Sequence, residues 1–134
     1  MRARKKPSRP GALAIELLLA LPIVMALILG MAQLSMLISA RQQVTVAARE
    51  AGRVAALGGT ATEVQETVDR FFGTKVATVQ MAVLDSNGDP IASGDPITVQ
   101  VRVQTTKLVP EMLKFIGFSM KGQELVARAV MRKE

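Results

Sequence analysis

Glu16 is the residue whose position most clearly demands a chemical explanation, because it is an acid at the start of a long apolar run. It lies in the stretch "PGALAIELLLALP" (residues 10–22), and the 24 residues from Leu17 to Ala40 carry no charge. A charged side chain at the centre of a bilayer costs about 2.5–3.5 kcal/mol on insertion scales, and less near the edge. Glu16 therefore requires a compensating interaction. The positive N-terminal end of a helix dipole is the simplest one available.

The chain lacks the residue types that most often carry catalysis. It contains no Cys and no His, so thiolate chemistry is absent, as is the commonest general base and transition-metal ligand. Catalysis would have to use carboxylates, Ser, Thr or Lys, and these residues form no recognisable arrangement. We therefore predict that the protein is not an enzyme. We expect no catalytic residues, no metal, no cofactor and no small-molecule substrate.

The stretch "DSNGDP" (residues 85–90) invites a calcium-binding interpretation. An EF-hand loop has its glycine at the sixth position, whereas Gly88 is fourth when Asp85 is counted as the first. The pair Asn87-Gly88 is typical of a tight hairpin turn. We therefore interpret the segment as a turn between two strands.

Positive charge is concentrated before Gly11. Of 17 basic residues, 5 precede this glycine, and 11 acidic residues nearly balance the rest. The five are Arg2, Arg4, Lys5, Lys6 and Arg9. Trp and Tyr are absent, which leaves few side chains on which bases could stack. We therefore expect no nucleic-acid partner.

A single membrane-spanning helix is predicted over residues 12–40. The apolar run is longer than the roughly 20 residues that a helix needs to cross a bilayer. It is also longer than the apolar core of a signal peptide, which is about 7–15 residues. Because the basic residues precede the run, the positive-inside rule places the N-terminus in the cytoplasm and the remainder outside it. Membrane lipid is a predicted partner.

The helix is predicted to continue as an amphipathic extension over residues 41–57. Small apolar residues recur there at helical spacing on one face. The face consists of Val44, Ala47, Ala48, Ala51, Val54 and Ala55. Arg41, Arg49 and Arg53 line the opposite face, which we interpret as solvated. The pair Gly58-Gly59 is suited to end the helix.

Residues 60–134 are predicted to form a small α+β domain with an antiparallel sheet of about three strands. Alternating apolar residues predict strands over 75–84 and 97–104. The stretch "ELVARAVM" (residues 124–131) is ambiguous by period, and we interpret it as a third strand. We expect a short helix capped by Thr62, with Gln65 in the capping-box position, that runs to about Phe72. So small a sheet has a marginal core of its own, so it is expected to cover the small-residue face of the extension.

The segment "LVPEMLKFIGF" (residues 108–118) lies between the second and third predicted strands. Pro110 is suited to open a helical turn, because proline is favoured at the first position of a helix. We interpret Phe115, Ile116 and Phe118 as part of the core rather than as an interface.

The basic leader, Gly11 and Glu16 five residues later, followed by an apolar helix, together resemble a class III (type IV pilin-like) signal. The resemblance implies that residues 1–11 are a prepilin leader. A membrane-embedded aspartyl prepilin peptidase would cut between Gly11 and Ala12 on the cytoplasmic side. Glycine allows extended backbone to approach a protease closely, and each basic residue favours an anionic inner membrane face by about 1 kcal/mol.

Two further features resemble the TadE-like minor pseudopilins of tight-adherence (Tad/Flp) pilus systems. Pro22 follows Glu16 by six residues, and the run "AAREAGRVAALGG" lies beyond the apolar segment. Pro22 removes a helical hydrogen bond and favours a kink. Leu17 stands where major pilins of this system typically carry tyrosine, which favours a minor component.

This resemblance implies a pilin-like fold and a structural role in pilus assembly, with other pilins and pseudopilins as partners. The protein would lie in the bacterial inner membrane, within or at the base of a pilus. It also implies a partner for Glu16, because cleavage creates an α-amino group at Ala12 whose reference pKa is about 7.7–8.0. Glu16 could pair with that amine or with the amine of a neighbouring subunit.

The alternative is an uncleaved single-pass membrane protein whose outer domain binds or regulates another envelope complex. In that case Glu16 has only the role of an acid near the positive end of the helix dipole.

Overall fold

A long helix, α1 (Pro10–Ala56), dominates the fold. The computed structural model describes residues 10–74, 76–82 and 91–134. With 47 residues, α1 is about 70 Å long at about 1.5 Å per residue, and it continues through Pro22 without interruption. The helix ends where Gly58 adopts a φ of 87°, a left-handed conformation that glycine accepts readily. The prediction of one continuous helix ended by the glycine pair is confirmed.

The second helix, α2 (Ala61–Phe72), begins two residues earlier than Thr62 would place it. Thr60 is the N-cap, and its backbone N–H donates to Oε2 of Glu63 at 2.8 Å. In return, the backbone N–H of Glu63 donates to Oγ1 of Thr60 at 3.4 Å. The predicted capping box of Thr62 and Gln65 is therefore wrong, because Thr60 and Glu63 have the same spacing and Thr60 directly follows the glycine turn.

Three antiparallel strands form one sheet in the order β1-β2-β3. They are β1 (Ala77–Met81), β2 (Pro96–Gln104) and β3 (Glu124–Arg132). Val101 of β2 pairs with Val79 of β1 and with Ala127 of β3. The α+β fold with a three-stranded sheet is confirmed. The predicted hairpin turn at Asn87-Gly88 lies outside the described residues.

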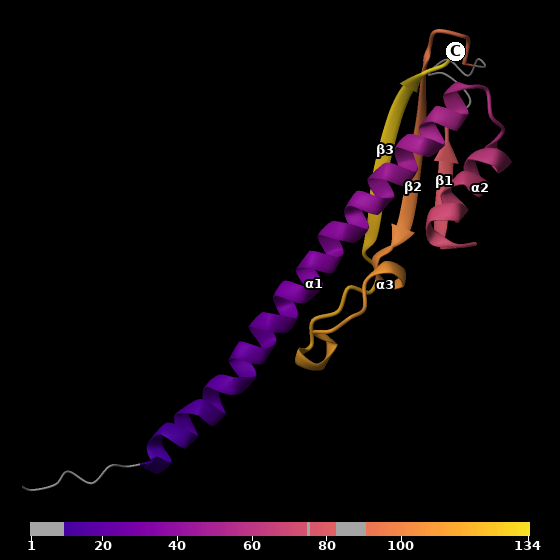
Figure 1. The fold of residues 1–134 in the computed structure, drawn as a ribbon. Helices are drawn as coiled ribbons and strands as arrows, with labels where there is room; N and C mark the ends of the chain where they lie inside the picture. Colours follow the sequence, from indigo (N-terminus) through magenta and orange to yellow (C-terminus); the bar gives the residue numbers. More distant parts are fainter. Residues whose placement is uncertain (1–9, 75, 83–90) are drawn as a thin grey trace, which may run out of the picture.

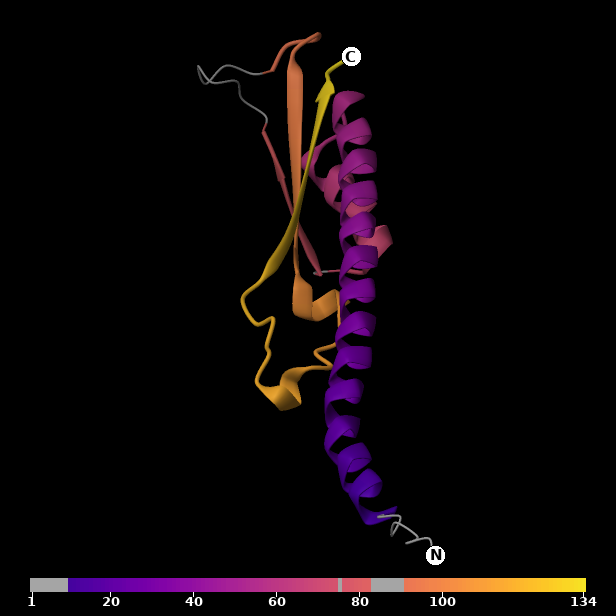
Figure 2. The same cartoon turned by 90° about the vertical axis from the view of Figure 1, so that its left-hand side faces the viewer.

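The C-terminal half of α1 and the whole of α2 pack on one face of the sheet (Figure 1, Figure 2). Their shared core is made of small and β-branched residues. It includes Val44, Ala48, Ala51, Ala55, Val64, Val68, Ala77, Ile97, Val99, Val101, Val103 and Ala129. The alternation predicted for the second strand is confirmed, as is the small-residue face of α1.

Gly52 of α1 marks a close approach between this helix and β3. A Cβ atom built at Gly52 would lie 3.2 Å from the Cβ of Ala129 and 3.5 Å from Cγ and Cε of Met131. Ordinary contacts between carbon atoms are about 3.5–4.0 Å. Glycine at this position therefore allows the helix to lie against the strand.

The outer edge of β1 is covered by a side chain of α2. Nε2 of Gln65 donates to the carbonyl oxygen of Ala77 at 3.1 Å, and Oε1 of Gln65 accepts from the N–H of Val79 at 3.2 Å. The amide of Gln65 thus binds the strand as a neighbouring strand would. An unpaired edge is a template for further strand pairing, and Gln65 occupies part of this one.

The connection from β2 to β3 leaves the sheet and runs along α1 (Figure 1). It begins with a single helical turn, α3 (Thr105–Leu108), and contains a short 3-10 helix, η1 (Lys114–Ile116). We call residues 109–123 the helix-packed loop. The predicted helical turn that opens at Pro110 is wrong. The turn precedes the proline, and Val109 is extended, with φ −124° and ψ 121°, as the residue before a proline prefers.

The prediction that Phe115, Ile116 and Phe118 belong to the core is also wrong. Their exposed fractions are 69%, 55% and 52%. Val109 and Met120 make the buried contacts instead, in a small cluster with Ala40 of α1. The aromatic residues lie at the tip of the helix-packed loop, beyond the end of the sheet.

Candidate functional site

The residues singled out from the sequence all lie at the start of α1. Gly11, Ala12 and Glu16 are within its first two turns, and Pro22 lies further along the same helix. Ala12 and Glu16 are four residues apart, which places them on one helix face, with an axial separation of about 6 Å. The helix therefore brings the two positions of the proposed amine–carboxylate pair within reach of each other.

The Glu16 side chain is exposed. Among the residues that the structure describes, none forms a hydrogen bond or an ion pair with it. Outside the described residues, lipid headgroups or another molecule could offset the cost of this carboxylate, and the positive N-terminal end of the helix favours it as well.

Gly11 has open space around its α-carbon. A Cβ atom built there would meet nothing within 4 Å, and Gly11 is not among the glycines with positive φ. Packing among the described residues therefore gives no reason for glycine at this position. A requirement for glycine would arise from a molecule that binds this backbone.

The first part of α1 has no cover from the rest of the described chain. Every residue from Leu13 to Met25 is exposed, and the most apolar 18-residue window of the helix has a mean hydropathy of 2.6. A long apolar helix that projects from its own domain indicates a single-pass membrane protein. The figures show this projection clearly (Figure 2).

Gln33 is a functional candidate that sequence reasoning missed. Its side chain is only 4% exposed, because the helix-packed loop covers it. Oε1 of Gln33 accepts from the backbone N–H of Leu113 at 3.1 Å, and Nε2 donates to Sδ of Met120 at 3.6 Å. A signal was present, since Gln33 is the single amide side chain in the uncharged run.

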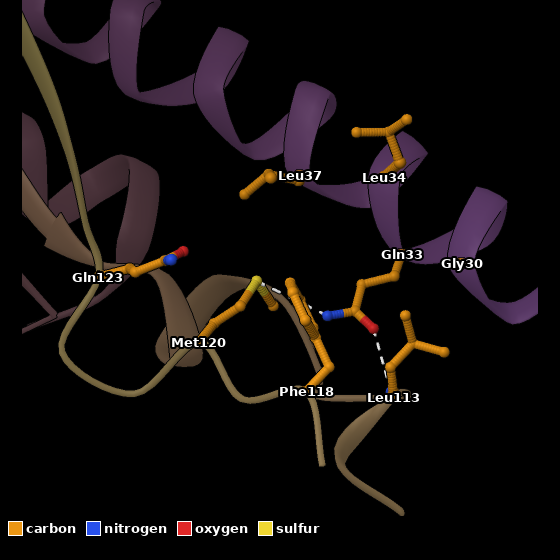
Figure 3. Close-up of a pocket in the computed structure, with 8 residues that line it drawn as sticks. All are labelled: Gly30, Gln33, Leu34, Leu37, Leu113, Phe118, Met120 and Gln123. Carbon is orange, nitrogen blue, oxygen red and sulfur yellow. Dashed lines mark hydrogen bonds between the residues drawn. The ribbon is translucent and has the colours of Figure 1, made fainter. Parts of the chain in front are cut away.

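Beside Gln33, a small apolar cavity of about 240 Å³ separates α1 from the helix-packed loop. Figure 3 shows Gln33 reaching from the helix to Leu113 and Met120, with Phe118 alongside. Leu34 and Leu37 line the helix side of the cavity. The cavity offers no charged group, so it is suited to packing rather than to chemistry.

Glu111 holds the two arms of the helix-packed loop together. Its Oε1 accepts from Oγ of Ser119 at 2.9 Å and from the backbone N–H of Met120 at 2.8 Å. These hydrogen bonds, first that of Ser119 and then that of Met120, lower the pKa of Glu111 below its ordinary value of 4.5. The nearby Lys114 and Lys121 add a smaller effect in the same direction.

The arginine face of the extension is exposed, as Arg41, Arg49 and Arg53 all contact solvent. Arg53 also lies 3.8 Å from Glu50, in a pair whose side chains are 69% and 46% exposed. Exposed pairs of this kind contribute little to stability. The described residues contain no group of three or more acidic residues that could hold a metal ion.

Comparison with known proteins adds one match. Residues 11–53 match the family model described as TadE-like protein. The matched segment begins at Gly11, contains Glu16, Pro22 and Gln33, and ends in the part of α1 that packs on the sheet. The resemblance inferred from the sequence is confirmed over these residues. No curated protein and no solved structure matches the chain.

Proposed function

We propose that this TadE-like, membrane-anchored chain is a minor pseudopilin that acts in the assembly of a tight-adherence pilus, as a structural subunit rather than as an enzyme. The observation that carries the proposal is the extent of the family match. It begins at Gly11 and covers the apolar helix together with most of its packing extension, to residue 53. A TadE-like segment indicates a component associated with the Tad pilus.

We infer that maturation occurs by cleavage between Gly11 and Ala12. A prepilin peptidase must approach the substrate backbone closely at the glycine that precedes the bond it cuts. Gly11 lies in the first turn of α1, where backbone N–H groups have no helical partner and unwinding is easiest. The open surroundings of Gly11 support a role in binding an outside molecule.

The basic residues of the leader set the proposed orientation of the chain in the membrane. The 5 basic residues before Gly11 favour the cytoplasmic side of the bacterial inner membrane. The sheet, α2 and the C-terminal half of α1 then lie on the extracytoplasmic side. The peptidase acts on the cytoplasmic side, where the leader is.

Glu16 acquires its role when the leader is removed. The new α-amino group at Ala12 is positive at neutral pH, and it lies one helical turn from Glu16 or at the same level on a neighbouring subunit. An amine–carboxylate pair offsets the cost of placing Glu16 near lipid. A pair between two subunits would also fix how far one helix lies along the other.

N-terminal sequencing of the chain extracted from its cells tests the proposal. A chain that begins at Ala12 supports it, and Gly11→Leu is expected to retain the leader. Because a larger side chain at Gly11 has open space in the fold, loss of cleavage would reflect peptidase recognition rather than misfolding. Ala14→Leu, an exposed change on the far side of the cut bond, is the matched control and should still be processed.

The opposite result is equally clear. A natural chain that keeps residues 2–11 in cells that process other pilins would contradict the proposal. It would support the uncleaved single-pass protein whose outer domain binds another envelope complex.

A further inference from the structure

The tip of the helix-packed loop exposes an unusual concentration of large apolar side chains. Phe115, Ile116 and Phe118 lie within four residues of one another and are 69%, 55% and 52% exposed. Ile116 and Phe118 flank Gly117, whose φ of 86° closes the turn. Apolar side chains clustered in this way on a small domain typically mark a contact with another molecule or with a membrane.

The tip lies at a defined level along α1. Leu113, just before the tip, lies against the helix at Gly30. A Cβ atom built at Gly30 would be 3.8 Å from Cδ1 of Leu113. From Leu13 to Gln33 the helix rises about 30 Å, which is about the thickness of the hydrocarbon core of a bilayer. If α1 spans the membrane from Leu13, the tip therefore meets the bilayer where the helix leaves it.

Several backbone N–H groups at and beside the tip are hydrogen-bonded within the chain. The N–H groups of Ile116 and Phe118 both donate to the carbonyl oxygen of Leu113, at 3.1 and 3.3 Å. The N–H of Gly117 donates to the carbonyl oxygen of Lys114, and the N–H of Leu113 donates to Oε1 of Gln33, each at 3.1 Å. In lipid, each backbone polar group without a partner is costly. These four N–H groups have partners within the chain.

Charge at the tip is also suited to a lipid surface. Lys114 begins η1 and Lys121 follows the tip, and both side chains are exposed. Lysine side chains at this level can extend to lipid phosphate groups while adjacent apolar residues enter the acyl region. The combination of exposed aromatic and aliphatic residues with flanking lysines is that of an interfacial membrane contact.

We propose that the tip of the helix-packed loop, residues 114–118, inserts into the interfacial region of the membrane leaflet from which α1 emerges. The loop is a second membrane contact, which sets the distance of the sheet from the bilayer. It requires that α1 span the membrane, but it does not depend on leader cleavage or on a role in a pilus. The buried Gln33 is then shielded from lipid by a loop that the membrane itself holds in place.

A tryptophan at the tip provides the test, because the natural chain contains no Trp and no Tyr. The full-length Phe115→Trp variant is reconstituted at one copy per lipid nanodisc, with and without lipids brominated at shallow acyl positions. Phe71→Trp is the matched control, since Phe71 is an exposed aromatic residue of α2 (46% exposed) on the sheet domain. Emission maximum, bromolipid quenching and quenching by aqueous iodide are measured for both.

We expect Phe115→Trp to emit at shorter wavelength than Phe71→Trp, to lose emission to bromolipid and to be protected from iodide. Phe71→Trp should show the reverse behaviour. Iodide quenching of Phe115→Trp equal to that of the control, with no bromolipid quenching, would overturn the proposal. So would protection that appears only after partner subunits are added, because it would assign the tip to a protein contact.

A second measurement guards against local misfolding in the tryptophan variant. A cysteine at Ile116, in a chain without natural cysteines, carries a spin label whose accessibility to oxygen and to a polar nickel complex reports depth. Oxygen should relax the label at Ile116 more strongly than nickel, and the label at the exposed control Ser93 should show the opposite order. Equal nickel accessibility at the two positions would contradict insertion.

Discussion

Replacement of Gly52 tests the contact between α1 and the sheet most directly. Gly52→Ala adds a Cβ atom that would lie 3.2 Å from the Cβ of Ala129, a few tenths of an ångström inside an ordinary carbon contact. The same substitution favours the helix by about 0.5–1 kcal/mol, because alanine restricts the unfolded chain more than glycine does. The two effects oppose each other, so we expect Gly52→Ala to change stability little.

Gly52→Leu should behave differently. Leucine has nearly the helix propensity of alanine, so the difference between the two variants isolates the cost of volume. The extra carbons would extend into the space that Ala129 and Met131 already occupy. Overpacking of this kind typically costs about 1–3 kcal/mol, and we expect Gly52→Leu to be less stable than Gly52→Ala by that amount.

The assay is the urea dependence of a brief trypsin pulse, applied to the full chain in mild detergent. For a small domain, stability falls by about 1 kcal/mol or more per molar urea, so the midpoint of Gly52→Leu should lie well below that of Gly52→Ala. Val46→Leu, at a position that is 52% exposed on the same helix, is the control and should match the natural chain. Equal midpoints for the two Gly52 variants would refute the close packing of α1 on β3.

Four further predictions follow from the contacts of single side chains. Glu16→Gln should still be cut after Gly11 but should no longer co-purify with other pilus subunits. If Glu16 interacted only with the helix dipole, its replacement would cost about 0.3–1 kcal/mol and the effect would be milder. Gln33→Leu leaves the N–H of Leu113 without its acceptor, at a cost of about 1–3 kcal/mol, and should speed tryptic cleavage in the helix-packed loop. Gln65→Ala removes two hydrogen bonds worth about 0.5–1.5 kcal/mol each, and should speed hydrogen exchange in β1 more than in β2. Because the pKa of Glu111 is lowered in the folded chain, the stabilisation that its carboxylate gives to the helix-packed loop is complete above the ordinary pKa of 4.5 and is lost as the pH falls through the lowered pKa. Cleavage of the loop by an acid-active protease should therefore rise in that acidic range. Glu111→Gln should not show this rise.

Each of these expectations has a contrary result. Normal association of the processed Glu16→Gln chain with other subunits would refute the proposed amine–carboxylate pair. Unchanged cleavage in Gln33→Leu would mean that the loop is held by apolar packing alone. Equal exchange in Gln65→Ala and the natural chain would mean that the covered edge of β1 is stable without its amide partner. A pH response that persists in Glu111→Gln would assign the response to another group.

The parts of the fold that repeat with a regular period were accessible from the sequence. Val99, Val101 and Val103 alternate with polar residues, and this alternation is the direct consequence of one buried and one exposed face. Ala48 and Ala51 recur at helical spacing, and their small size predicted that a sheet would pack closely on them. Such patterns are local, because each residue reports its own burial whatever covers it.

The helix-packed loop was not accessible in the same way. Phe115 and Phe118 are as apolar as core residues, and nothing local distinguishes a buried aromatic residue from one at a loop tip. They are exposed because the chain leaves the sheet after α3, where Val109 before Pro110 is extended, and the following loop runs along α1. Gln33 carried a signal as a lone amide among apolar residues, but its partners are 80 and 87 positions away in the sequence.

The unbroken α1 also has a mechanical consequence. Because β2 and β3 run alongside the helix (Figure 2), a pull along its axis loads the whole helix–sheet contact in shear, and all of its side chains resist together. A sideways pull would instead peel the contact open from one end, where only a few residues bear the load at a time. Because α1 runs unbroken from the apolar segment to the sheet, an axial displacement of its apolar end would be passed to the sheet through the helix. The contact between α1 and the sheet should therefore resist an axial load better than a sideways one.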